Sequence, residues 1–135
     1  MFNKHALTPN TVSAPVGPYS HSYAVDSGRT RTIYLAGQCG TLQDGSIAGD
    51  NDMFEQTRQT LLNIEKILAA HGATFGDVIK TTTYVTDIDR RGEVSLARAS
   101  FLPTPPPPST LIEVSRLVDP NYLIEIEVVA VIEVP

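Results

Sequence analysis

Two glutamates, Glu125 and Glu127, stand in one of the most apolar stretches of the chain, residues 122–134. Alternation of side chains along this stretch predicts a strand with one wholly apolar face and a second face that is mostly apolar. Such a strand is typical of the centre of a sheet that is covered on both sides. A carboxylate there must find a partner or take up a proton, and one whose pKa moves toward neutrality can act as a general base. The alternative is that both glutamates lie at a subunit interface and bond backbone groups or arginine.

Other residues with reactive side chains are isolated from one another. Cys39 is the single cysteine, which excludes an internal disulfide and is compatible with a reducing, cytoplasmic location. It could be a nucleophile, but no histidine is near it in the sequence, and buried inert thiols are commoner. His5, His21 and His71 are too far apart in the sequence to suggest a metal site, so we expect no metal.

The bulk composition narrows the class of protein. A net charge of −5 and a pI near 5.0 argue against a nucleic-acid partner, because the phosphate backbone requires clustered Lys and Arg. No stretch approaches the roughly 18 apolar residues of a membrane span, and the first residues have no apolar core of signal-peptide length. We therefore expect one domain covering residues 1–135, with residues 1–13 as a loosely held arm and no membrane association.

The expected elements alternate between strands and helices. Strands are expected at residues 21–25, 32–36, 78–85, 109–117 and 122–134, and helices from Asp50 or Asn51 to His71 and at residues 93–102. The proline-rich residues 103–108 form a stiff, extended lead-in to a strand. This order predicts an α/β (α+β) two-layer sandwich in which the helices cover one face of the sheet. Oligomerisation would cover the other face.

Four motifs in this order resemble one known family. They are Pro-Val-Gly-Pro-Tyr-Ser at residues 15–20, Leu-Ala-Gly-Gln at 35–38, Val-Ile-Lys-Thr-Thr at 78–82 with Val-Thr-Asp-Ile at 85–88, and Ile-Glu-Ile-Glu at 124–127. Together, across nearly the whole chain, they resemble the Rid superfamily of reactive intermediate deaminases, also called the YjgF family.

The resemblance implies a chorismate-mutase-like mixed sheet of about six strands and a homotrimer with clefts between subunits. In the archetypal branch these clefts hydrolyse imines and enamines to 2-keto acids and ammonia, with no metal or organic cofactor. The motif positions imply that Tyr19 lines the cleft, that Gly37 offers its backbone to the ligand and that Glu125 orients the attacking water. Asp89 falls where the archetype has Asn, facing the neighbouring subunit.

One position departs from the archetype. The family pattern has an Arg at the start of the penultimate strand that pairs with the substrate carboxylate, and here the position is Ser109, or Pro108 with a one-residue shift. Neither replaces a planar guanidinium, so small carboxylates should bind about 30- to 1,000-fold more weakly. Arg116 lies seven residues after Ser109, on the opposite face of a regular strand, and cannot stand in for it.

Three functions remain open from the sequence. The first is hydrolysis of an imine or enamine other than a simple 2-imino acid, with Glu125 orienting water and with Tyr19 and Ser109 or Thr110 binding the ligand. The second is a non-catalytic trimeric protein that binds or senses a small molecule. The third is a ribonuclease or translation inhibitor, an old label of the family, which the acidic pI disfavours.

Overall fold

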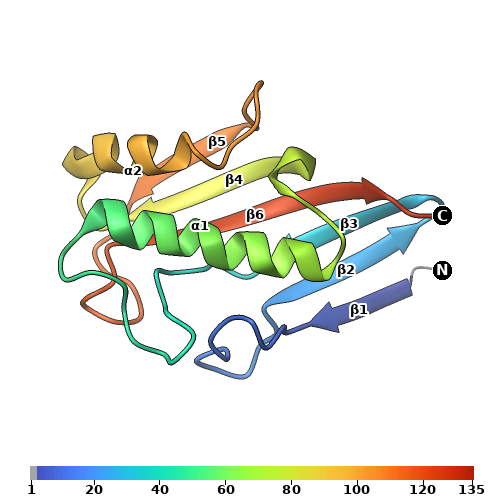
Figure 1. Ribbon diagram of the computed structural model, residues 1–135, viewed down its shortest axis with the longest axis horizontal. Coiled ribbons are helices and arrows are strands. Elements are labelled where there is room, and N and C mark those ends of the chain that lie inside the picture. Colours follow the sequence, from blue (N-terminus) through green and yellow to red (C-terminus); the bar gives the residue numbers. More distant parts are fainter. Residues whose placement is uncertain (1–2) are drawn as a thin grey trace.

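The computed structural model describes residues 3–135, which form one six-stranded sheet and two α-helices (Figure 1). The strands are β1 (Asn3–Leu7), β2 (Ser22–Ser27), β3 (Thr30–Leu35), β4 (Val78–Val85), β5 (Ser109–Glu113) and β6 (Ile124–Glu133). The helices are α1 (Met53–Ala70) and α2 (Arg91–Arg98), and short 3₁₀ turns at Phe75–Asp77 and Ile88–Arg90 precede β4 and α2.

The last strand, β6, lies in the interior of the sheet. The strand order is β1-β2-β3-β6-β4-β5, with β6 antiparallel to both neighbours and β4 parallel to β5, so the sheet is mixed as predicted. Ile124, Ile126 and Val128 are at most 2% exposed, while Glu125 and Glu127 between them are half-buried. The alternation of the strand therefore puts both carboxylates on the face opposite the apolar core.

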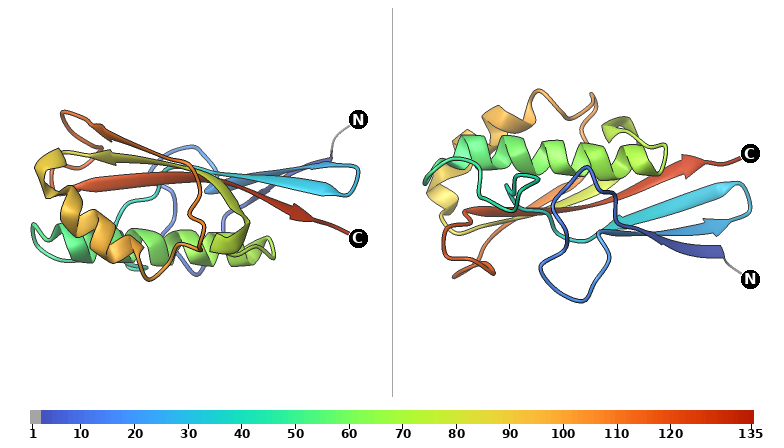
Figure 2. Two further views of the ribbon diagram at one scale, coloured as in Figure 1. Left: turned by 90° about the horizontal axis from the view of Figure 1, so that it is seen from above. Right: turned by 60° about the horizontal axis from the view of Figure 1, so that its bottom comes forward.

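Both helices cover the same face of the sheet, as predicted, and Figure 2 shows them side by side below it in the left view. The side chain of Asp52 accepts a hydrogen bond from the Glu55 amide and begins α1, and Gly72, with a φ of 80°, follows its end. Leu61, Ile64 and Leu68 of α1 are buried as the periodicity predicts.

The N-terminal arm is the main correction to the sequence analysis. Residues 3–7 are not irregular; they pair antiparallel with β2 at the edge of the sheet, from Asn3 opposite Asp26 to Leu7 opposite Ser22. These residues are mostly polar, as is usual for an edge strand with one side in water. A short polar segment shows little of the residue pattern that predicts a strand. Residues 1 and 2, also part of the expected arm, lie outside the described residues.

Several element boundaries also differ from expectation. The first helix begins after Asp52 rather than after Asp50 or Asn51, α2 begins two residues early and ends at Arg98, and β5 ends at Glu113. Arg116 is therefore in an exposed loop and not in a strand. The expectation that its side chain points to the opposite face from Ser109 assumed a regular strand, so it does not apply.

The face of the sheet away from the helices carries exposed apolar side chains. Tyr23 and Tyr34 face each other across β2 and β3 and are 42% and 50% exposed, and Ile112 on β5 is 41% exposed. Large exposed aromatic and aliphatic groups on one sheet face are characteristic of an interaction surface.

Candidate functional site

A small pocket of about 60 Å³ lies where three segments far apart in the sequence meet. The segments are residues 12–21, the loop that follows β3, and the start of β6. The side chains and backbone that line the pocket include Tyr19, His21, Gly37, Cys39, Tyr122 and Glu125. Three of the residues expected from the sequence to form the site, Tyr19, Gly37 and Glu125, thus border one cavity.

Glu125 supplies the acid of this pocket. Burial raises the pKa of its carboxyl, and the nearby negative charge of Glu127 raises it further, while a hydrogen bond from Cys39 acts in the opposite direction. Glu127, by contrast, accepts a hydrogen bond from the Tyr84 hydroxyl at 2.6 Å and is not part of the pocket lining. A carboxyl with a raised pKa in a cavity is a candidate general base.

Gly37 leaves room for the Glu125 side chain. A Cβ at position 37 would lie 2.7 Å from the Glu125 Cδ and 2.8 Å from its Oε2, closer than van der Waals contact allows. The carboxylate therefore packs directly on the Gly37 backbone. Among the described residues, neither the N–H nor the carbonyl of Gly37 makes a backbone hydrogen bond.

Cys39 stays a protonated thiol. Its Sγ lies 3.6 Å from Glu125 Oε1, and burial, followed by the charge of Glu125, strongly raises the pKa of the thiol. Since the thiolate is the nucleophilic form, Cys39 is suited to donate a weak hydrogen bond to Glu125 and not to attack a substrate.

The loop that carries Gly37 and Cys39 is held by residues that the sequence analysis did not single out. Asn63 of α1 donates from Nδ2 to the carbonyls of Cys39 and Thr41, at 3.1 and 2.8 Å. The Thr41 and Tyr122 hydroxyls lie 2.6 Å apart. The available signal was a polar residue, Asn63, next to the apolar residues Leu61 and Ile64 of a helix, because a buried amide requires a hydrogen-bond partner nearby.

His21 is a buried histidine in the pocket lining, and both of its ring nitrogens have hydrogen-bond partners. Its Nε2 lies 2.6 Å from the Ser13 carbonyl and its Nδ1 lies 3.3 Å from the Gln38 amide nitrogen. The carbonyl can only accept, so Nε2 carries the hydrogen and Nδ1 accepts from Gln38. With both nitrogens occupied, His21 shapes the pocket wall and has no free site for a substrate proton.

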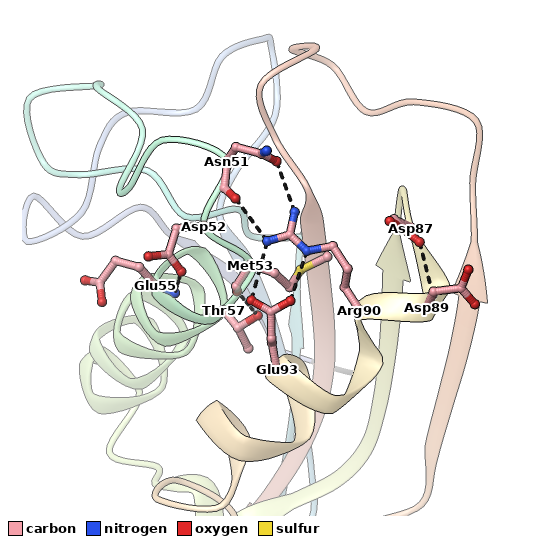
Figure 3. Close-up of polar contacts among 9 residues, drawn as sticks. All are labelled: Asn51, Asp52, Met53, Glu55, Thr57, Asp87, Asp89, Arg90 and Glu93. Carbon is pink, nitrogen blue, oxygen red and sulfur yellow. Dashed lines mark hydrogen bonds and ion pairs between the residues drawn. The ribbon is translucent and has the colours of Figure 1, made fainter.

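Asp89 lies away from the Glu125 pocket. It is in the turn between β4 and α2, where its amide donates to the Asp87 side chain, and Figure 3 shows its carboxylate directed away from the Arg90 guanidinium. Arg90 instead binds Glu93 and Asn51, which joins the turn before α1 to α2 (Figure 3).

Ser109 and Thr110 open β5, also outside the pocket lining. Because consecutive strand residues point to opposite faces, each contacts a different cation. Ser109 Oγ accepts from Arg98 Nη2 at 3.1 Å on the helix side, and Thr110 Oγ1 lies 2.7 Å from Lys80 Nζ on the open side. Within one chain, Asp89, Ser109 and Thr110 do not join the group around Glu125.

The part of the chain that the structure describes has neither a cluster of metal-ligating side chains nor a membrane-spanning helix. No group of three or more His, Cys, Asp or Glu side chains within residues 3–135 is arranged to hold a metal ion. No helix in the same range is long and apolar enough to cross a membrane.

Comparison with known proteins gives a consistent result. The family model described as Endoribonuclease L-PSP matches residues 10–132. A RutC family protein of Pyrococcus horikoshii is 34% identical over 127 residues, which cover 94% of this chain and 97% of the relative. The 2-iminobutanoate/2-iminopropanoate deaminase of Homo sapiens is 33% identical over 124 residues, with coverage of 90% and 87%. The crystal structure of the E. coli YjgF gene product superposes with a TM-score of 0.80 at 31% identity, covering 94% of this chain and 98% of that one.

Proposed function

Because the chain belongs to the YjgF/Rid family, we propose that it hydrolyses an imine or enamine metabolite in the Glu125 pocket. The observation that carries the proposal is the half-buried Glu125 carboxyl, which packs on the Gly37 backbone and has a raised pKa. The N–H and the carbonyl of Gly37 make no backbone hydrogen bond among the described residues. Relatives in mouse and human are named 2-iminobutanoate/2-iminopropanoate deaminase, and that name supports a C=N bond as the target.

The chemistry requires one group that moves a proton. Glu125 in its ionised form accepts a proton from a water molecule while the water oxygen attacks the imine carbon. The protonated carboxyl then gives that proton to the nitrogen, which leaves a carbinolamine with one hydroxyl and one amino group. Glu125 next accepts the proton of the hydroxyl and passes it to the nitrogen, so the C=O bond forms as the C–N bond breaks, and a carbonyl compound and ammonia leave. An enamine first becomes an imine by taking a proton on carbon and losing one from nitrogen. A carboxyl with a pKa near the working pH serves both halves of this cycle, which is the usual requirement for general acid–base catalysis.

The positions of the other pocket groups support binding roles. Tyr19 is 47% exposed at the mouth of the pocket, where its ring and hydroxyl can contact a ligand. The backbone of Gly37 offers one donor and one acceptor next to the Glu125 carboxylate. Neither role requires a cofactor.

The charge of the pocket bears on the substrate. No Lys or Arg lines it within the described residues of one chain. Ser109, at the position where the archetypal family pattern has Arg, lies outside this lining and has no guanidinium to offer. A substrate carboxylate would therefore find no bidentate partner in this pocket. We propose that the preferred substrate is an imine other than the simple 2-imino acids.

A rate measurement tests this proposal. Imines are generated in situ from a panel of amino acids and simple amines, and their loss is followed by trapping the remainder with semicarbazide. We expect rate enhancement that is greatest for an imine without a carboxylate. No enhancement on any imine, with a metabolite still bound to the purified protein, would support the alternative of a non-catalytic ligand-binding or regulatory protein. Cleavage of RNA by a preparation free of contaminating nuclease would support the third alternative, which a net charge of −5 disfavours.

We further propose that the chain works as a homotrimer, in which the sheet face opposite the helices is covered by other copies. The support is the row of exposed apolar groups on that face, including Tyr23, Tyr34 and Ile112. A light-scattering mass of three times 14.6 kDa is the expected result. A mass of a single chain at micromolar concentration would contradict the trimer.

A further inference from the structure

Arg98, the last residue of α2, carries a positive charge with no acidic partner among residues 3–135. The ion pairs in this range join Arg31 to Asp26, Arg58 to Glu55 and Arg90 to Glu93. Arg98 Nη2 instead donates to two hydroxyls, at 3.1 Å to Ser109 Oγ and at a long 3.5 Å to Thr81 Oγ1.

Burial makes this arrangement unfavourable in the absence of a ligand. Loss of water around the guanidinium lowers the pKa of Arg98, and no neighbouring charge acts on it. A guanidinium nevertheless stays charged at neutral pH, so it remains a half-buried cation that neutral hydroxyls do not compensate. An anion that reached it would therefore form a stronger contact than at a fully hydrated surface arginine.

Nε and Nη1 of Arg98 have no hydrogen-bond partner among the described residues. A guanidinium has five N–H groups in a planar fork, and only Nη2 has a partner within the described residues. Neither Nε nor Nη1 is among the buried polar atoms that lack a partner, so neither atom is fully buried.

A cavity of about 320 Å³ adjoins this guanidinium, between the end of α2 and the proline-rich segment before β5. It is lined by Arg98, Ala99, Leu102, Pro103 and Pro106 together with the hydroxyl residues Ser95 and Thr104. One charged fork, two hydroxyls and an apolar wall match the usual composition of a pocket for a small organic anion.

We propose that this cavity is a binding site for a small monocarboxylate with a short apolar chain, anchored by Arg98. A carboxylate accepts two parallel N–H bonds from a guanidinium, and the apolar chain would contact Leu102 and the prolines. Inorganic phosphate shares the charge but not the chain, so it is the weaker ligand.

The site is separate from the Glu125 pocket, since no residue lines both cavities. It thus goes beyond the proposed function, and its test does not depend on catalysis. The nearest competing explanation is that a carboxylate of a second copy pairs with Arg98 in an oligomer.

The test is a titration of the full chain with butanoate, and separately with inorganic phosphate, followed by the backbone amide signals of Ala99 and Leu102 in ¹H–¹⁵N spectra. We expect saturable shifts with butanoate in the wild type and in Glu125→Gln. Arg98→Gln should lower the affinity about 10- to 100-fold. Arg91→Gln is the matched control: it removes an exposed arginine of the same helix, outside the cavity, and should bind as the wild type does.

Three results would overturn the proposal. The first is the absence of saturable shifts in the wild type. The second is equal affinity in Arg98→Gln and Arg91→Gln. The third is a change of solution mass in Arg98→Gln, which would show that another copy occupies the site. If Arg98→Gln does not fold, Arg98→Lys keeps the charge and removes the planar fork, and it too must bind butanoate more weakly.

Discussion

Replacing Gly37 with alanine should lower the rate of imine hydrolysis without unfolding the protein. The added Cβ would lie 2.7 Å from Glu125 Cδ, 2.8 Å from Oε2 and 2.9 Å from Cγ. Carbon atoms pack at about 3.5–4.0 Å, so the carboxyl must move by about 1 Å. A displacement of that size at a reacting group lowers the rate by about 100-fold.

The fold should tolerate this change. Gly37 is not among the glycines with positive φ, so alanine fits the backbone, and the atoms in the way belong to the end of a flexible side chain. A Gly-to-Ala change at a compatible position gains about 0.4–1 kcal/mol by restricting the unfolded chain, which offsets part of the strain. The melting temperature should therefore stay within a few degrees of the wild type.

Two other glycines provide controls for the imine-trapping assay and the thermal melt. Gly92 of α2 has nothing within 4 Å of an added Cβ, so Gly92→Ala should keep full activity. At Gly40 the Cβ would lie 2.8 Å from the Gln56 carbonyl oxygen, a backbone atom that cannot turn aside, so Gly40→Ala should lose stability and activity together. Full activity in Gly37→Ala, or inactivity explained by unfolding, would refute the proposed contact between position 37 and Glu125.

Three further outcomes follow from the same structure. Because the Cys39 thiol stays protonated, Cys39→Ala should keep most of the activity, and iodoacetamide should label native Cys39 slowly at neutral pH; rapid labelling would contradict this. Gln56→Ala should lower the free energy of unfolding in urea by about 2–4 kcal/mol, because it deprives the Asn121 carbonyl and the Leu123 amide of buried partners; a change under about 0.5 kcal/mol would show that these bonds are replaced. The folded-state pKa of Glu125 lies above the ordinary 4.5, so the folded protein binds more protons between the two values and loses stability as the pH rises through that window. Glu125→Gln should remove this loss and melt higher than the wild type at neutral pH, but not at pH 4; identical melting curves throughout would contradict the raised pKa.

The sheet centre was predictable because its residues carry strong periodic signals. One wholly apolar face and one mostly apolar face in residues 122–134 indicated a strand in the interior of the sheet, and β6 indeed lies between β3 and β4. Val78–Val85 was expected with the bounds that the structure has, because β-branched residues fill it. Edge strand β1 was missed, since pairing with β2 and not its own pattern makes Asn3–Leu7 extended.

The candidate site was only partly predictable from sequence. The motif positions pointed to Tyr19, Gly37 and Glu125, which the fold brings around one cavity. The hydrogen bonds of Asn63 depend on how α1 packs against a distant loop, and no local pattern encodes that contact. Arg98 was passed over for the same reason: its contact with Ser109 joins the end of a helix to a strand across the proline-rich segment.

The central claim is that the Glu125 carboxyl transfers the protons of imine hydrolysis, and a pair of matched variants tests it most directly. Glu125→Gln and Glu127→Gln change the same group two residues apart on β6, but only Glu125 lines the pocket. We expect kcat/KM for the preferred imine to fall by about 100- to 10,000-fold in Glu125→Gln and by less than tenfold in Glu127→Gln. Equal activities in the two folded variants would contradict the claim.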